Sequence, residues 1–523
     1  MLLPELTRRL VNGAWIANCS RAHRRFTTAL GLIKKTQHHR LLALLRRNAH
    51  TRFGEAHGFA GIRSIAEFQQ RVPITPYAAL APHIEAIANG ETGVLTAEPV
   101  RLFQPTSGST SGTKLIPWTA GVAQEFRCGI DPWLHTLYRR RPELLRGTAY
   151  WSISPPSTAP RTHGHLRVGF DHDSSYLGFL GQKLFSLVSA APAQVAQTRD
   201  ITEFRTRTLL ALLADESLSL ISVWSPTFLT TLLDEFLARQ DEILALLVAN
   251  RRSGSRKRAE YLQSLLRTGH TPGLFEQVWP KLAHLSCWTH GPSDTYATNL
   301  RRHFPSVEIQ GKGLVATEAF VSLPLLANAD PVLAVTSHFF EFQSPETGQL
   351  SLAHELVAGG EYDVIVTTGG GLYRYPLGDR VRVTGFVQDA PCLRFVGRGN
   401  LVSDLFGEKL HGAFVQQVIN RALAEQHIQA RFALLAPVPA AASTAYTLFL
   451  AADTIPSPET LRQSLELGLT ENFHYAHCRH LGQLAHSRLF RIQEDPHSAE
   501  TVFQQEMVSR GAGWGRGGRG AVA

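Results

Sequence analysis

The chain has 523 residues, of which 44% are hydrophobic and 18% charged; this is the composition of a packed globular protein and excludes a largely disordered one. The length exceeds a single ordinary core, so we expect two or more domains. The net charge of +9 comes from 52 basic and 43 acidic residues scattered along the chain. Because no nucleic-acid-binding module accompanies it, this excess favours a solvated surface or an anionic small substrate over nucleic acid.

The cysteine pattern indicates a reducing compartment, and the hydropathy pattern argues against a membrane span. Five cysteines lie far apart and include no C-x-x-C pair, which argues against a disulfide framework or a structural zinc site. No segment offers the ~20 uninterrupted apolar residues that a membrane span needs, and arginines interrupt the first thirty residues. We therefore expect a cytoplasmic protein without a membrane span. The oligomeric state cannot be inferred from the sequence.

Helices are predicted over the first hundred residues, where four leucines between 41 and 45 form an apolar stripe among arginines. Mixed short strands and helices follow. An apolar run at 217–223 predicts a buried strand, and Pro226 begins an amphipathic helix directly after it. Two further strands are predicted at 282–288 and 307–310.

Another strand is predicted for the β-branched run at 363–368, which is closed by three glycines. We expect residues 372–375 and 380–386 to form a hairpin around Gly378. The composition changes shortly afterwards, and we place a domain boundary near residue 398.

The boundary predicts a large domain over residues 1–398 and a small α+β domain over residues 399–523, in line with usual domain sizes. Within the small domain we predict a helix at 408–426, strands at 431–436 and 446–452, and a helix that has Ser457 as its N-cap and Pro458 in its first turn.

The loop from Thr106 to Lys114 reads TSGSTSGTK and holds six hydroxyls, two glycines and a lysine. Backbone N–H groups of such a loop can point at one anion, because glycine tolerates the required dihedral angles. The lysine adds a point charge. Only three residues separate the glycines and Thr113 precedes the lysine, so this is not a Walker loop. On these residues alone, a phosphate-binding loop and a plain linker both remain open.

Four segments in order carry a family resemblance. The TSGSTSGTK loop resembles the signature of adenylate-forming enzymes, and the IPWT that follows at 116–119 narrows the resemblance to the auxin-responsive Gretchen Hagen family of acyl acid amido synthetases. QGKGLVATE at 310–318 resembles that family's second nucleotide motif, and LYRYPLGD at 372–379 its third. GRGNLVSD at 397–404 resembles the hinge before the small domain. The resemblance spans most of the chain and is closest to bacterial members.

The resemblance implies a mixed α/β fold, in which a large N-terminal adenylate-forming domain with β-sheets flanked by helices precedes a small, mobile α+β domain. It implies a ligase that uses ATP and Mg²⁺. A carboxylic acid and ATP give an acyl-adenylate and pyrophosphate; an amine, usually that of an amino acid, then displaces AMP. The acyl-acid pocket is expected to draw on residues 151–176 and 224–228.

The resemblance also implies residue roles. Lys114 would cradle the phosphates of ATP, and Glu318 would lie beside the α-phosphate and bind Mg²⁺, for which a carboxylate is a suitable ligand. Leu314 and Thr317 would line the nucleotide site. The loop residues expected to bind the phosphates are Ser107, Gly108, Ser109, Thr110, Ser111 and Gly112.

Three residues nearer the C-terminus complete the expected site. Asp379 would accept hydrogen bonds from both ribose hydroxyls, although an aspartate after glycine is also a common turn residue. Tyr373 and Tyr375 would share one face of a strand; Tyr373 is a candidate nucleotide contact, although such tyrosines often serve packing alone. Lys409 resembles the family lysine near the nucleotide, carried by the mobile domain.

One departure from the family leaves alternatives open. Family members carry a lysine near the C-terminus that contacts the reacting groups, whereas no lysine follows Lys409 here. Either Arg516 substitutes, or adenylation is slow, or the end of the reading frame is altered; we expect a lysine-containing family ending to raise adenylation. Two rival functions follow: an acyl-CoA ligase-like enzyme, or a nucleotide-binding homologue with impaired turnover.

Overall fold

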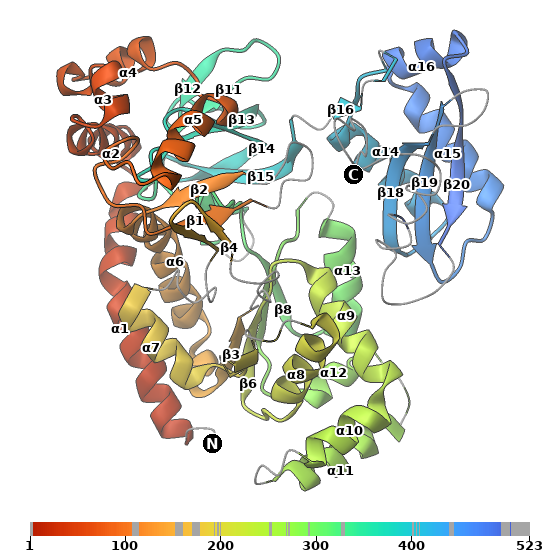
Figure 1. The fold of residues 1–523 in the computed structure, drawn as a ribbon. Coiled ribbons are helices and arrows are strands. Elements are labelled where there is room, and N and C mark those ends of the chain that lie inside the picture. Colours follow the sequence, from red (N-terminus) through yellow and green to blue (C-terminus); the bar gives the residue numbers. More distant parts are fainter. Residues whose placement is uncertain are drawn as a thin grey trace.

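The C-terminal strands and helices lie beside the rest of the chain in the computed structural model (Figure 1). The structure describes residues 4–492 and 503, apart from 107–113, 152–160, 170–177, 193, 196–197, 199, 250–253, 268, 270–271, 291–292, 326–329, 400–401, 404, 407 and 439–443. Helices and several β-sheets alternate along it, so the predicted mixed α/β class is confirmed.

Helices dominate the first hundred residues, as predicted. They are α1 (Glu5–Ala29), α2 (Ile33–Arg47), α3 (Arg52–Ala56), the 3₁₀ helix η1 (Phe59–Gly61), α4 (Ile65–Arg71) and α5 (Tyr77–Ala88). The four leucines of the apolar stripe are buried on α2. Side-chain oxygens of Thr51 and Ser64 accept hydrogen bonds from the first turns of α3 and α4, which satisfies backbone donors that a helix start leaves free.

A parallel sheet of four strands forms the centre of the lower half of Figure 1. Its order is β3 (Thr148–Trp151), β6 (Leu218–Ser222), β7 (His284–Cys287) and β8 (Glu308–Gly311). The strands predicted at 217–223, 282–288 and 307–310 are thereby confirmed. Because the strands are parallel, their carboxyl ends lie at one edge of the sheet.

Helices flank this sheet. They are α6 (Ala120–Arg140), η2 (Pro142–Arg146), α7 (Gly178–Val188), α8 (Ile201–Leu213), α9 (Pro226–Ala238), α10 (Gln240–Ala249), α11 (Ser255–Arg267), α12 (Leu274–Val278) and α13 (Ser293–His303). The helix predicted at Pro226 is α9, capped by Ser225. In the part of the chain that the structure describes, no helix has the length and apolarity to cross a membrane.

A second sheet has the strand order β2-β1-β5-β4, built from β1 (Leu102–Pro105), β2 (Leu115–Trp118), β4 (Arg161–His163) and β5 (Leu166–Val168). Strands β1 and β2 pair in antiparallel fashion, and the Thr106 N–H donates to the Lys114 carbonyl over 2.9 Å. These contacts hold together the two ends of the serine- and glycine-rich loop, whose residues 107–113 lie outside the described chain.

The largest sheet has seven strands, in the order β12 (Leu350–Leu352), β11 (Phe339–Gln343), β13 (Glu361–Thr367), β14 (Tyr375–Val387), β15 (Ala390–Arg398), β10 (Val332–Leu333) and β9 (Ser322–Leu323). The strand predicted at 363–368 is β13. The predicted hairpin around Gly378 is wrong, because β14 runs through this glycine and turns only before β15. Gly378 has φ +82° where the pairing with β13 shifts register, so it marks a bulge.

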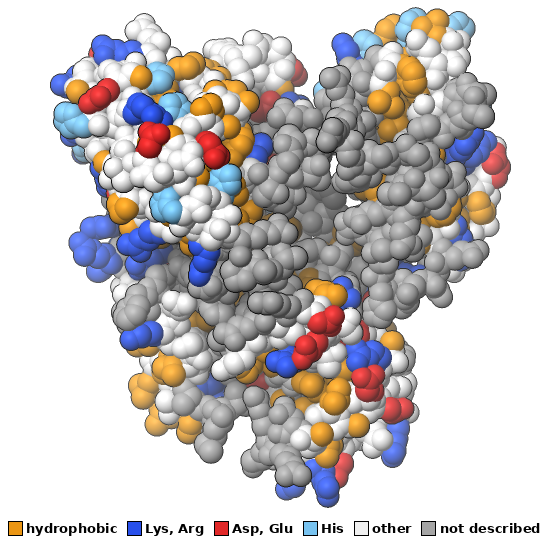
Figure 2. Space-filling view, in the orientation of Figure 1, with side chains coloured by type: hydrophobic (Ala, Val, Ile, Leu, Met, Phe, Trp, Pro, Cys, Tyr) orange, Lys and Arg blue, Asp and Glu red, His pale blue; other side chains and the backbone are white. Residues whose placement is uncertain are grey.

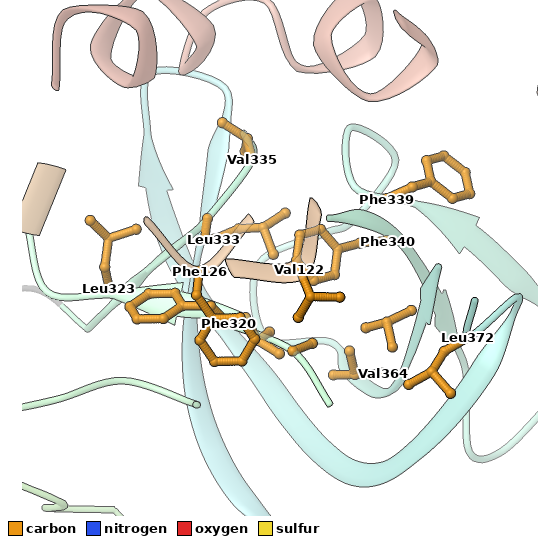
Figure 3. Close-up of a cluster of buried hydrophobic side chains, with 14 of the residues drawn as sticks. Val122, Phe126, Phe320, Leu323, Leu333, Val335, Phe339, Phe340, Val364 and Leu372 are labelled. Carbon is orange, nitrogen blue, oxygen red and sulfur yellow. The ribbon is translucent and has the colours of Figure 1, made fainter. Parts of the chain in front are cut away.

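Apolar side chains from α6 and the seven-stranded sheet form one buried cluster (Figure 3). The rings of Phe126 and Phe320 lie edge to face with centroids 6.1 Å apart, an arrangement that aromatic pairs favour. At the surface, Figure 2 shows basic and acidic side chains intermixed on the visible face.

The C-terminal part has its own core. Strands β18 (Ala430–Val438), β19 (Thr444–Ala452) and β20 (Leu484–Arg491) form a sheet beside α14 (Gly412–Glu425), α15 (Pro458–Thr470) and α16 (Phe473–His480), and β16 (Val402–Ser403) pairs with β17 (Leu410–His411). Their apolar side chains form two clusters that contain no residue of the N-terminal part. The predicted strands and the Ser457 cap of α15 are confirmed, whereas the helix predicted from 408 begins only at Gly412.

Candidate active site

The carboxyl ends of the parallel strands border a cavity of about 530 Å³. Ser222 at the end of β6 and Lys312 just after β8 lie in its wall, together with side chains of α6, β14 and β15. Gln104 and Thr106, at the base of the serine- and glycine-rich loop, line it too. Ligands of open α/β sheets bind at this edge of the strands, which makes the cavity the candidate site.

The segment after β8 supplies one wall. Gly313 has φ +84°, and a Cβ there would stand 2.5 Å from the Ser322 carbonyl oxygen, so only glycine fits this turn. The Leu314 N–H donates to the Ser322 hydroxyl over 2.9 Å, and the Val321 N–H donates to the Leu314 carbonyl. These bonds hold Leu314 and Thr317, both predicted site residues, in the cavity wall.

Glu318 and Lys114, two of the predicted catalytic residues, are joined through Tyr375. The Lys114 ammonium donates to the Tyr375 hydroxyl over 3.3 Å. Burial raises the pKa of the Glu318 carboxyl, whereas a hydrogen bond from Tyr375 and the charges of Lys114 and Arg398 lower it. Burial outweighs these opposing effects, so the pKa of Glu318 lies above the ordinary glutamate value.

Asp379 lies on β14 and pairs with Arg398 at the end of β15. Their closest atoms, Asp379 Oδ1 and Arg398 Nε, are 3.3 Å apart. Burial raises the pKa of Asp379 to about 6, against the charge of Arg398, and Glu318 raises it further. The predicted residues Glu318 and Asp379 thus lie in one cavity and interact electrostatically.

The structure places Tyr373 away from this cavity. Strand β14 begins only at Tyr375, and Arg374 before it has φ +48°, so the expectation that the two tyrosines share a strand face is wrong. Tyr373 is fully buried; its hydroxyl donates to the Leu95 carbonyl over 2.7 Å and its ring stacks on Phe53.

Lys409 does not line the cavity, and the phosphate loop lies outside the described residues. Lys409 is exposed in the C-terminal part, where its carbonyl accepts a hydrogen bond from Asn472. The six predicted loop residues, 107–112, and Arg516 lie outside the described chain. Among the described residues, no group of three or more His, Cys, Asp or Glu side chains is arranged around a common metal position.

The aromatic part of the cavity was not predicted residue by residue. Trp133 on α6, Trp151 at the end of β3, Trp224 after β6 and Trp288 after β7 line it. Trp224 directly follows one predicted strand and Trp288 ends another, and strand ends are where α/β proteins bind ligands. That signal was available in the sequence; the contribution of α6 was not, because it depends on helix packing.

Residues 22–309 match the GH3 family N-terminal domain, and residues 331–398 match the GH3 family central domain. The chain belongs to the GH3 family. The resemblance drawn from the four motifs is thereby confirmed.

Several GH3 proteins resemble this chain. The indole-3-acetic acid-amido synthetase GH3.8 of Oryza sativa subsp. indica is 26% identical over 434 residues, which cover 73% of this chain and 69% of the relative. The indole-3-acetic acid-amido synthetase GH3.2 of Arabidopsis thaliana is 23% identical over 423 residues, covering 72% and 76%. A solved AtGH3.15 acyl acid amido synthetase in complex with 2,4-DB superposes with a TM-score of 0.81 at 18% identity, covering 95% of this chain and 92% of the other. The GH3 fold therefore extends over nearly the whole chain.

Proposed function

We propose that this GH3 protein is an ATP-dependent acyl acid amido synthetase, a ligase that forms carbon–nitrogen bonds. The observation that carries the proposal is the grouping of Glu318, Asp379 and Arg398 beside an aromatic chamber in one cavity. The amido synthetase activity of the relatives agrees with it. We also propose a cytoplasmic location, in keeping with the use of ATP.

The cavity has features that suit a nucleotide. The Gln104 Oε1 and Thr106 Oγ1 atoms are buried without a hydrogen-bond partner among the described residues, and a bound polar ligand would satisfy them. We assign the adenine to the apolar segment 314–316 and the ribose hydroxyls to Asp379. Lys114 and the loop residues 107–112 are proposed to bind the phosphates.

Two steps make up the proposed reaction. An oxygen of the substrate carboxylate attacks the α-phosphorus of ATP, and pyrophosphate leaves. The amine nitrogen then attacks the acyl carbon, loses a proton, and AMP leaves. Lys114, held by Tyr375, would offset negative charge that grows on the phosphate oxygens. Glu318 would hold Mg²⁺, which when bound supplies further charge neutralisation.

We propose that a domain boundary lies between residues 398 and 399. Strand β15 ends at Arg398 and the residues from 410 onward pack in a separate core, which supports the division. Lys409 lies on the small domain; we propose that this domain moves and brings Lys409 to the nucleotide in one of the two steps.

A two-stage assay tests the proposal. Purified protein is given ATP, Mg²⁺ and a panel of aryl, indole and fatty acids, and pyrophosphate release is followed; amino acids or coenzyme A are then added and AMP release is measured. Acid-dependent pyrophosphate release followed by amino-acid-dependent AMP release is expected. Release that depends on coenzyme A would instead identify an acyl-CoA ligase. ATP binding without acid-dependent release would identify a nucleotide-binding homologue.

A further inference from the structure

Lys312 is a buried cation in the aromatic part of the cavity. Only 8% of the residue is exposed. Its ammonium donates to the Ser222 hydroxyl over 2.5 Å and lies 5.1 Å from the ring centroids of both Trp133 and Trp224. Its backbone N–H donates to the Cys287 carbonyl over 3.0 Å. The side chain is thus held in place by the ends of three neighbouring strands and by α6.

The hydrogen-bonding capacity of this ammonium is only partly used. An ammonium has three N–H donors, and among the described residues the Ser222 hydroxyl is its one hydrogen-bond acceptor and no carboxylate pairs with it. Burial lowers the pKa of Lys312 to about 7, with only the Cys287 thiol acting in the opposite direction. A buried charge is costly unless a partner compensates it, and an anionic oxygen in the cavity would be such a partner.

A second unpaired donor lies in the same cavity. The Trp151 indole N–H is buried and has no acceptor within the described part of the chain. The ring centroids of Trp133 and Trp151 are 5.8 Å apart, and those of Trp224 and Trp288 are 5.7 Å apart. Tryptophan faces with two polar donors suit an aromatic ligand that bears an acceptor group.

Lys312 belongs to a different set of contacts from the proposed nucleotide residues. The Glu318 and Asp379 carboxyls interact with Lys114 and Arg398, whereas Lys312 contacts Ser222 and tryptophans. The carboxylate that is activated must reach the α-phosphate, and we assign that phosphate to the residues around Glu318 and Lys114. An anion on Lys312 would therefore be another group of the same substrate.

We infer that Lys312 binds a second anionic oxygen group on the acyl acid, so that the preferred substrates are aromatic acids with an additional carboxylate remote from the one that is activated. This inference rests on the proposed function, because it takes the tryptophan-lined part of the cavity as the acyl-acid site. It names a specificity determinant for that site: the charge of one lysine in a chamber walled by tryptophans.

The test compares matched acids on the full-length protein. Benzoate and naphthoate are measured beside their dicarboxylates with the second carboxylate at remote ring positions, and beside the corresponding monomethyl esters, which keep the size and remove the second charge. Binding is followed by quenching of the pocket tryptophans, and turnover by ATP-dependent pyrophosphate release. The variants are Lys312→Met, Lys312→Gln in case the first does not fold, and Lys257→Met, an exposed lysine on α11.

The wild-type protein and Lys257→Met are expected to bind a dicarboxylate at least about tenfold more tightly than its monomethyl ester, as a charged hydrogen bond provides. In Lys312→Met or Lys312→Gln this ratio should fall close to one. An unchanged ratio overturns the inference, as does an equal loss for monoacids and diacids, which would place the activated carboxylate on Lys312. Wild-type protein that binds no diacid overturns it too. Diacid binding without any pyrophosphate release counts against the proposed function and leaves the role of Lys312 supported.

Discussion

Asp379 and Arg398 are cross-strand partners on β14 and β15, and their side chains meet with Asp379 Oδ1 3.3 Å from Arg398 Nε. The carboxyl is buried, whereas half of the Arg398 side chain is exposed. The pair therefore leaves the carboxyl facing the cavity while only partly offsetting the cost of burying its charge. Its proposed role as the ribose acceptor depends on that charge.

The raised pKa of Asp379 predicts a pH dependence of nucleoside binding. Its pKa is about 6 in place of 3.8, so the carboxylate is ionised at pH 7.5 and largely protonated at pH 5. The ionised form accepts hydrogen bonds from ribose hydroxyls more strongly, so adenosine should bind roughly tenfold more weakly at pH 5. Adenosine is the probe because it carries no titrating phosphate. Calorimetry on Asp379→Asn should give a weak affinity that no longer changes through pH 6; a wild-type affinity that stays constant there contradicts the assignment.

Replacement of Glu318 by glutamine should slow adenylation and change its dependence on Mg²⁺. The amide keeps the size of the side chain but loses the charge that a hard cation prefers. We expect pyrophosphate release to fall about 100-fold, or about 2.7 kcal/mol in activation free energy, with half-maximal rate at a higher Mg²⁺ concentration. Glu346→Gln, at an exposed position, is the control. A variant as fast as the wild type, with the same Mg²⁺ dependence, would remove Glu318 from the mechanism.

Alanine at Gly313 should disturb the wall of the nucleotide site. The residue combines φ +84° with a position where a Cβ would lie 2.5 Å from the Ser322 carbonyl oxygen. Gly359 has the same φ but open space around it, so Gly359→Ala isolates the cost of the backbone conformation. Gly313→Ala should lose more unfolding free energy than this control, by about 1–3 kcal/mol, and should bind adenosine more weakly. Equal losses in urea unfolding would show that the clash is relieved.

Phenylalanine at Tyr373 and at Tyr375 should have different consequences. The Tyr373 hydroxyl hydrogen-bonds to the buried Leu95 carbonyl and to the Asn48 side chain, so its loss should cost about 1–3 kcal/mol of unfolding free energy. The Tyr375 hydroxyl joins Lys114 and Glu318, so Tyr375→Phe should mainly lower the rate of pyrophosphate release. Parallel urea unfolding and kinetics distinguish the two. A rate loss confined to Tyr373→Phe would place Tyr373 at the nucleotide instead.

Local signals account for the elements that the sequence predicted well. The strand β6, the Ser225-capped helix α9 and the cap of α15 each depend on residues close in sequence, and such signals persist whatever the tertiary context. The two errors near Gly378 and Tyr373 have one kind of cause. Gly378 has a left-handed backbone within β14 and makes a bulge there. Arg374, just before β14, is also left-handed and separates two tyrosines that alternation would place on one face. Side-chain patterns do not report these backbone angles.

The sequence by itself determined the family, the order of the nucleotide motifs and most of the regular elements, because short-range composition and spacing carry that information. Only the tertiary structure decided which side chains share the cavity. The Lys312 ammonium lies 5.1 Å from the ring centroid of Trp133, although the two residues are far apart in sequence. The packing of α6 against the strand ends brings them together. The same burial withdraws water from Lys312 and Asp379 and shifts the pKa of each. Desolvation arises only when the chain is packed, and it makes these two charged residues candidates for binding a ligand.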